Sequence, residues 1–246
     1  MLFLSVINPF FEKCSCKMPD NKSILERWGI TEQELTDLVD QNPSLRGIML
    51  GYVAEKKFHD TFLDHPQITE KSKDDDHNRK RKGDRRIIYK GKSLTIEVKS
   101  LQTAMVEQVG PDQWRGKAQV DASDRRIVKF PDGTELNTTL LLRGEFDLLA
   151  VNCFAFGGQW RFVFAKNSDL PFSGFKKYTE AQRAQLIASL IPVTWPPEPP
   201  FRDNPFPLLN ELLMEKKDVS IVKTEEKVVE KETVLKIKKR KARKGT

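Results

Sequence analysis

The sequence has few of the residues that build cross-linked or zinc-stabilised proteins. Among its 246 residues, only three are cysteine and three are histidine. Cys14 and Cys16 are one residue apart and Cys153 is remote, so this odd count excludes a disulfide framework and indicates free thiols. No second cysteine pair stands at ligand spacing and the histidines are not clustered, which argues against a zinc site. A reducing, cytoplasmic location is therefore expected.

Long apolar runs are missing as well. The most apolar stretch, MLFLSVINPFF at residues 1–11, is much shorter than the ~20 residues that cross a bilayer. It has neither a basic n-region nor a small-residue cleavage site, so a signal peptide is not expected. We predict a flexible arm over residues 1–18 and no membrane partner.

The positive charge of the chain is concentrated at its C-terminal end. Residues 215–246 hold twelve Lys/Arg and six Asp/Glu, which accounts for +6 of the formal net charge of +7. The rest of the chain is close to neutral, so attraction to a polyanion must come from local patches or from this tail. The tail ends KIKKRKARKGT and has few aromatics, a composition that predicts disorder.

Hydrophobic periodicity and turn residues predict an α/β protein. Thr31, with Glu34 three residues later, predicts the start of a helix, and a second helix is expected over residues 44–63. After a charged loop at residues 70–86, the stretch IIYKGKSLTIEVKS predicts two strands around a turn at residues 90–92. The later expectations are a loop followed by a helix (102–126), a β-hairpin (146–165) and a short helix (179–190).

This order of elements predicts a mixed central β-sheet of four or five strands flanked by helices. We expect one domain over residues 19–191. The next segment holds seven prolines, so residues 192–214 are expected to form an extended strap packed on that domain. Residues 215–246 form the disordered basic tail of this scheme.

The stretch SLTIEVKS, residues 93–100, is the most informative for chemistry. Alternate residues of a strand share a face, so Leu94, Ile96 and Val98 should point into the core. Glu97 and Lys99 should then share the opposite face. A hairpin turn at residues 90–92 would also bring Asp84, at the start of the preceding strand, beside Glu97.

Two close carboxylates repel each other unless a divalent cation lies between them. Mg²⁺ binds one or two carboxylates, keeps several waters and accepts phosphate oxygens, and it eases deprotonation of bound water. A neighbouring lysine can orient or deprotonate the attacking water, or stabilise the charged transition state. The alternative interpretation makes Glu97 and Lys99 an ordinary exposed pair and Asp84 a turn residue.

The group Asp84 with Glu97-Val98-Lys99 resembles the PD-(D/E)XK nuclease superfamily, which has the restriction-endonuclease-like fold. The resemblance covers roughly residues 45–165 and implies that Asp84, Glu97 and Lys99 are catalytic. It also implies an acidic metal ligand on the preceding helix, and Glu55 in GYVAEKKF matches, so the implied Mg²⁺ ligands are Glu55, Asp84 and Glu97. Gly83 stands where the family often has proline, and Asp76 is an alternative to Asp84 if the first strand begins earlier.

Basic residues near this group predict contacts with nucleic acid. Residues 71–92 hold ten Lys/Arg and four Asp and lead into Asp84. Phosphate binding is the natural role of such residues, and a solvated charged loop is the alternative. The expected nucleic-acid-binding residues are Lys80, Arg81, Arg85, Arg86, Arg125 and Arg126. Superfamily members also often carry a glutamine or lysine on a helix after the strand that holds the Glu-x-Lys (ExK) element, here Glu97 to Lys99. Gln119 matches that residue and is expected to support the site.

The leading hypothesis is an Mg²⁺-dependent endodeoxyribonuclease of restriction type that hydrolyses phosphodiester bonds in duplex DNA, with a homodimer able to cut both strands. A repair or recombination nuclease with the same core is the second hypothesis. The third is a DNA-binding protein that does not cut. An RNA substrate also stays open at this point.

Overall fold

The computed structural model describes residues 22–73 and 84–216. The chain divides into two compact units, Met1–Met49 and Leu50–Thr246, and the division falls within one helix, α3. The expected N-terminal arm lies outside the described residues, as does nearly all of the expected basic tail. No helix of the described part has the length and apolar character needed to cross a membrane.

The helices of the first unit begin at side-chain caps. Ser23 caps α1 (Ile24–Trp28) and Thr31 caps α2 (Glu32–Gln41), each through a reciprocal capping box with the glutamate three residues later. The predicted helix start at Thr31 is therefore confirmed. The third helix, α3 (Pro43–Phe58), begins with proline, whose fixed φ suits a first helical turn. It is followed directly by a π-helical turn, His59–Leu63.

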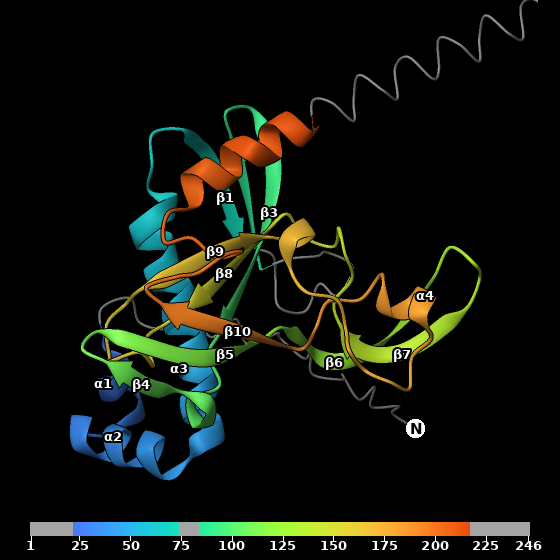
Figure 1. Cartoon of the computed structure of the whole chain (residues 1–246). Helices are drawn as coiled ribbons and strands as arrows, with labels where there is room; N and C mark the ends of the chain where they lie inside the picture. Colours follow the sequence, from blue (N-terminus) through green and yellow to red (C-terminus); the bar gives the residue numbers. More distant parts are fainter. Residues whose placement is uncertain (1–21, 74–83, 217–246) are drawn as a thin grey trace, which may run out of the picture. The chain divides into compact units, whose positions relative to one another are not determined.

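The second unit is built on a five-stranded mixed sheet with strand order β1-β2-β3-β8-β9 (Figure 1). Neighbouring strands are antiparallel except for β3 and β8, which are parallel. The prediction of a mixed sheet is confirmed. The strands are β1 (Ile68–Lys73), β2 (Arg85–Tyr89), β3 (Lys92–Ser100), β8 (Leu148–Asn152) and β9 (Phe162–Lys166).

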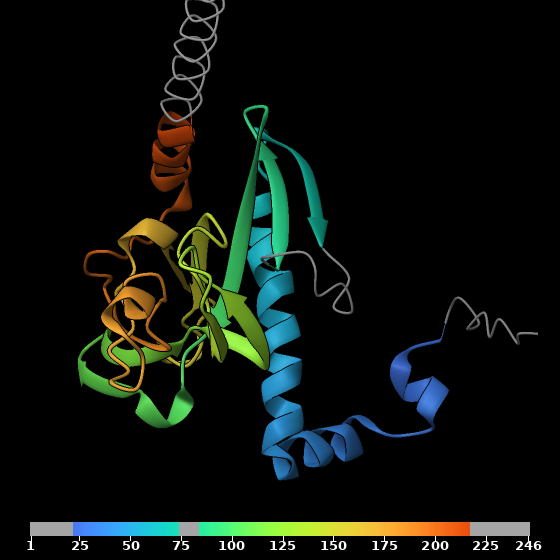
Figure 2. The same cartoon turned by 90° about the vertical axis from the view of Figure 1, so that its right-hand side faces the viewer.

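Both faces of this sheet are covered. On one face, Leu94, Ile96 and Val98 of β3 pack in a core that also contains Phe58 of α3. A helix over residues 205–216 adds four leucines to that core, and it lies beside the sheet in both views (Figure 1 and Figure 2). On the other face, Leu149 and Val151 belong to a second core.

The second core is completed by strands that the sequence analysis did not predict. A three-stranded sheet has the order β10-β5-β4, and a two-stranded ribbon joins β6 and β7. The expected helix within residues 102–126 is wrong, because apart from a 3-10 turn at Thr103–Met105 this region is extended. The strands are β4 (Glu107–Gly110), β5 (Gln113–Gln119), β6 (Asp121–Lys129), β7 (Glu135–Leu140) and β10 (Leu190–Trp195).

Three other expectations need correction. Residues 68–73 form β1 by pairing with β2, although their charge suggested the beginning of a loop. The helix expected over residues 179–190 is only α4 (Glu180–Arg183). The expected strap is a strand, β10, followed later by helix 205–216. That helix forms because Leu208, Leu209, Leu212 and Leu213 recur at helical spacing and are buried.

Candidate active site

The hairpin β2–β3 sets the position of Asp84. Arg85 pairs with Ile96 and Arg86 with Thr95, so Asp84, the residue before β2, is at the level of Glu97. One carboxylate oxygen of Asp84, Oδ2, accepts a hydrogen bond of 2.8 Å from the backbone N–H of Val98. This bond fastens the carboxylate to β3. The side chain is therefore held at the strand that carries the other two predicted catalytic residues.

Glu97 and Lys99 form an ion pair on β3, with 2.7 Å between Lys99 Nζ and Glu97 Oε1. The prediction that these two side chains share a face is confirmed. The alternative of an ordinary exposed pair is wrong, because Glu97 is only 7% exposed. A buried carboxylate is costly unless it has partners, so the surrounding charges decide its state.

Those charges give the pair unusual proton affinities. Burial, and then the negative charge of Asp84, raise the pKa of Glu97 to about 7, although the ammonium of Lys99 opposes the shift. Burial disfavours the ammonium of Lys99, but Glu97, Asp84 and Asp121 outweigh it and raise the pKa of Lys99. Lys99 is therefore a cation at neutral pH, whereas Glu97 titrates near neutrality.

The carboxylates fit a divalent cation in part. Mg²⁺ needs only one or two protein carboxylates, and Asp84 is near enough to Glu97 for its negative charge to raise the pKa of Glu97. Within residues 22–73 and 84–216, however, no three carboxylate, imidazole or thiol groups are gathered so that they could hold a metal ion. The three-acid set of Glu55, Asp84 and Glu97 is therefore not assembled in this structure.

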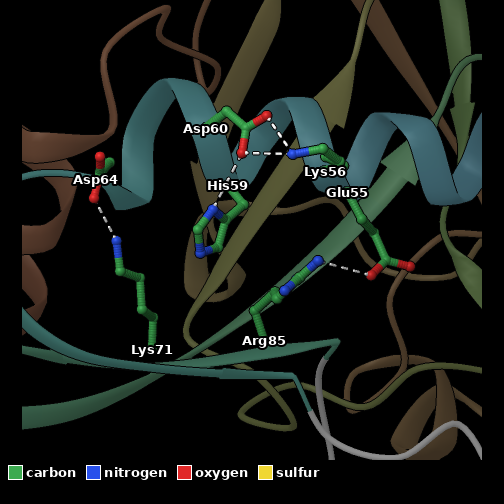
Figure 3. Close-up of polar contacts among 7 residues, drawn as sticks. All are labelled: Glu55, Lys56, His59, Asp60, Asp64, Lys71 and Arg85. Atoms are coloured by element: carbon green, nitrogen blue, oxygen red, sulfur yellow. Dashed lines mark hydrogen bonds and ion pairs between the residues drawn. The ribbon is translucent and has the colours of Figure 1, made fainter. Parts of the chain in front are cut away.

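Glu55 instead has an ion pair with Arg85, at 3.3 Å between Oε2 and Nη2 (Figure 3). Arg85 is opposite Ile96 in the ladder, so its side chain leaves β2 on the face where Ile96 packs with α3. Glu97, one residue along β3, belongs to the other face. This pair accounts for the half-buried carboxylate of Glu55, and it also occupies a guanidinium predicted to bind nucleic acid.

The other charged groups at the end of α3 also pair with one another. Lys56 Nζ lies 2.9 Å from Asp60 Oδ2, and Lys71 Nζ lies 2.7 Å from Asp64 Oδ1 (Figure 3). Both contacts join opposite charges locally. By contrast, Asp84, just before β2, and Glu97, on β3, are two like charges near each other.

Arg86 is placed differently from Arg85. It is opposite Thr95, so it leaves β2 on the face of Glu97. Its Nε atom is buried and has no hydrogen-bond partner among the described residues, but the same is true of Arg85, Arg126 and Arg143. What distinguishes Arg86 from Arg85 is its face of the sheet, which is the face of Glu97.

The other residues predicted near the site have mixed positions. Gln119 is on β5 rather than on a helix, is exposed, and accepts a hydrogen bond from Gln102. Arg126 is held by both guanidinium nitrogens Nη1 and Nη2 against Glu145. Arg125 is exposed and lines a cavity. Lys80, Arg81 and Asp76 lie outside the described residues.

Two acids near Glu97 and Lys99 were not among the predicted site residues. Asp121 is close enough to raise the pKa of Lys99, and Glu145 contributes to the raised pKa of Glu97. Glu145 lies just before β8, which pairs in parallel with β3. An acid at the entrance of the strand beside the ExK strand is the signal that would have indicated it.

The described cysteine is not a competing nucleophile. Cys153 is a free thiol, as predicted, and is fully buried. Burial raises its pKa to about 12, which leaves almost no thiolate at neutral pH.

Comparison of the chain with protein-family models, with curated proteins and with solved structures gives no match. The function must therefore be argued from the residues and their geometry.

Proposed function

We propose that this protein is a metal-dependent endonuclease that hydrolyses phosphodiester bonds in DNA. The observation that carries the proposal is the buried ion pair of Glu97 and Lys99 beside the fixed carboxylate of Asp84. Buried charged groups with shifted pKa values are characteristic of catalytic sites. The resemblance of these three residues to the PD-(D/E)XK pattern gives the reaction class.

In this proposal, Asp84 and Glu97 would hold Mg²⁺, which would neutralise charge on the phosphate and make bound water more acidic. Lys99 acts as a cation, since its raised pKa makes it a poor base at neutral pH. Its ammonium group stabilises the additional negative charge that develops on the phosphate oxygens. Of the two roles that the sequence left open for Lys99, the proposal therefore takes stabilisation of the charged transition state rather than deprotonation of water.

The raised pKa of Glu97 describes the metal-free site, where Mg²⁺ would have to displace a proton before Glu97 could bind it. Water supplies the hydroxyl group that bonds to phosphorus, the bond from phosphorus to the leaving oxygen breaks, and the leaving oxygen ends protonated. Arg86, on the face of Glu97, would contribute positive charge to the binding of the phosphate.

The test is incubation of the full chain with supercoiled plasmid and Mg²⁺, followed by gel analysis and sequencing of the ends. We expect nicked or linear products from the wild type. Lys99→Ala and Glu97→Gln should lower the cleavage rate by at least about 100-fold, the size of effect expected for a lost acid–base or charge-stabilising group. DNA binding, measured with Ca²⁺, should persist in both variants.

A matched control exists on another hairpin. Lys129 and Glu135 form an ion pair of the same 2.7 Å length, but both side chains are largely exposed. Lys129→Ala and Glu135→Gln should cut plasmid like the wild type. Equal cleavage by the wild type and Glu97→Gln would exclude this site. DNA binding without cleavage by the wild type would favour the non-catalytic alternative, and a fixed sequence at the cut ends would favour restriction over repair.

A further inference from the structure

A cavity of about 470 Å³ opens beside the ribbon β6–β7 and is independent of the catalytic pair in its lining residues. Its walls come from both strands of the ribbon, from the segment before α4 and from the start of β10. In Figure 1, β6, β7 and α4 lie together. This volume is within the range of ~300–1,000 Å³ that is usual for sites of small ligands.

The cavity is close to the proposed active site. Asp121, at the first position of β6, is one of its lining residues. Leu101, just after β3, forms an antiparallel bridge with Ala118 of β5, so the chain from Ala118 to Asp121 runs back alongside Lys99. A group bound against Asp121 would therefore lie on the side of the cavity nearer to Lys99.

The two aromatic residues that line the cavity, Phe175 and Tyr178, are held in place by contacts with neighbouring residues. The hydroxyl of Tyr178 is 3.0 Å from the buried hydroxyl of Thr138. The ring of Phe175 meets that of Tyr178 edge to face, with centroids 4.9 Å apart. Phe175 stays 49% exposed, so its ring is available for stacking. Beneath them, a small separate core that includes Leu140 and Leu186 supports the ribbon.

The polar groups of the cavity match the edge of a nucleobase. A carboxylate accepts hydrogen bonds from amino groups such as cytosine N4, and a guanidinium donates to ring nitrogens and carbonyl oxygens. Asp121 and Arg125 supply one group of each kind. Stacking on an aromatic ring and hydrogen bonds to the base edge are the two means by which proteins hold an unstacked base.

From these observations we infer that the cavity lined by Asp121, Arg125, Phe175 and Tyr178 binds one unstacked nucleobase of the DNA substrate, next to the phosphodiester bond that is cut. The inference rests on the proposed nuclease function for its choice of ligand. A base that remains paired in a duplex cannot enter a cavity, so the bound nucleotide is either flipped out or already single-stranded. Asp121 can accept hydrogen bonds from the amino groups of adenine, cytosine and guanine, whereas thymine offers a carboxylate only its N3–H, so thymine should bind most weakly.

Gly174 offers a way to close the cavity without disturbing the fold. It lines the cavity, and a Cβ atom built on it meets nothing within 4 Å. Gly174→Leu should therefore fill space that the base needs, whereas Gly174→Ala adds a single carbon in open space and is the matched control. Phe175→Ala removes the stacking surface at an exposed position and provides an independent second variant.

The experiment measures binding of the four deoxynucleosides to the full chain by ligand-observed NMR in EDTA, with 2-deoxyribose as the probe without a base. We expect base-dependent binding with thymidine weakest and no binding of 2-deoxyribose. Gly174→Leu and Phe175→Ala should each weaken binding by about tenfold, whereas Gly174→Ala should change it less than about twofold.

Absence of nucleoside binding by the wild type would overturn the inference, and so would equal binding by the wild type and both weakening variants. Thymidine binding as tight as that of deoxycytidine would overturn the role of Asp121. Neither metal nor cleavage is involved in this assay. A chain that cuts plasmid but binds no nucleoside therefore loses only the base site, and a chain that binds nucleosides but does not cut loses only the nuclease proposal.

Discussion

At the scale of single residues, burial determines the ionisation state of Glu97. An ExK tripeptide on an exposed strand would be an ordinary ion pair worth little free energy. Here β3 is covered on both faces, so the carboxylate loses water and depends on Lys99 and Asp84 for its ionisation state. The alternation of residues along a strand predicted which side chains share a face. It did not predict the burial, which comes from strands distant in the sequence.

The first prediction concerns the stability of the metal-free protein as pH changes. The pKa of Glu97 is raised in the folded state from 4.5 to about 7, so its favourable contribution to folding is complete below pH 4.5 and is lost as pH rises through about 7. In EDTA, the free energy of unfolding of the wild type relative to Glu97→Gln should fall by about 3 kcal/mol across this window. Urea denaturation at a series of pH values measures it.

The control for this prediction is Glu135→Gln, which removes a largely exposed carboxylate from a lysine pair. Its free energy of unfolding relative to the wild type should stay nearly constant over the same pH range. Parallel pH curves for the wild type and Glu97→Gln would contradict the assignment of a buried, protonatable Glu97.

The second prediction concerns Mg²⁺. A cation bound to Asp84 and Glu97 must displace the proton that Glu97 holds at low pH, so binding should strengthen as pH rises through about 7. Mg²⁺ should therefore raise Tm more at about pH 8 than at about pH 5, because a ligand stabilises the folded state according to its affinity. Thermal unfolding with and without EDTA measures this. Asp84→Asn should lose most of the increase, and an increase that is independent of pH would count against Glu97 as a ligand.

At the scale of elements, the hairpin β2–β3 could be predicted because its turn and its apolar alternation both appear in the sequence. Strand β5 could not, since two of its inward positions are the small residues Gly116 and Ala118. Gly116 faces Phe156 so closely that a Cβ atom would be 3.1 Å from the ring. The packing therefore requires glycine at position 116, and a glycine there interrupts the alternation of apolar and polar residues by which a strand is predicted. Likewise, the sequence did not indicate the pairing of Glu55 with Arg85, because the two residues are 30 positions apart.

The third prediction belongs to the ribbon β6–β7. Arg126 on β6 joins Glu145 in the loop before β8, and the Glu145 side chain is only 6% exposed. Removing the guanidinium leaves a buried carboxylate without that counter-charge, so Arg126→Ala should destabilise the protein by about 2–4 kcal/mol. Chemical denaturation measures the loss. Arg125→Ala, at the exposed neighbouring position, should change stability by less than about 0.5 kcal/mol. Equal effects of the two variants would show that the ion pair does not anchor the ribbon.

At the scale of the whole molecule, we expect folding and the proposed attraction to DNA to depend on different parts of the chain. The core beneath the five-stranded sheet includes four leucines from helix 205–216. Tyr89, whose hydroxyl is 3.1 Å from Asn210 Oδ1, further joins that helix to β2. By contrast, residues 217–246 hold eleven Lys/Arg and five Asp/Glu, so they carry +6 of the net charge of +7. The division between these two roles should therefore fall near residue 216.

Two truncations test this division. A chain that ends at residue 216 keeps helix 205–216 and should unfold with a Tm within a few degrees of the full chain. Its non-specific affinity for DNA should be weaker, and the slope of log K against log salt should become shallower by up to about 5, because six net positive charges no longer meet phosphates.

Ending the chain at residue 204 also removes Leu208, Leu209, Leu212 and Leu213 from the core, and burial of each is worth ~1.5–3 kcal/mol. That loss approaches or exceeds the whole stability of a typical domain, so this shorter chain should not fold. Circular dichroism melting and filter binding at several salt concentrations distinguish the outcomes. An unchanged salt slope in the first truncation would place the DNA attraction in the body of the protein rather than in its tail.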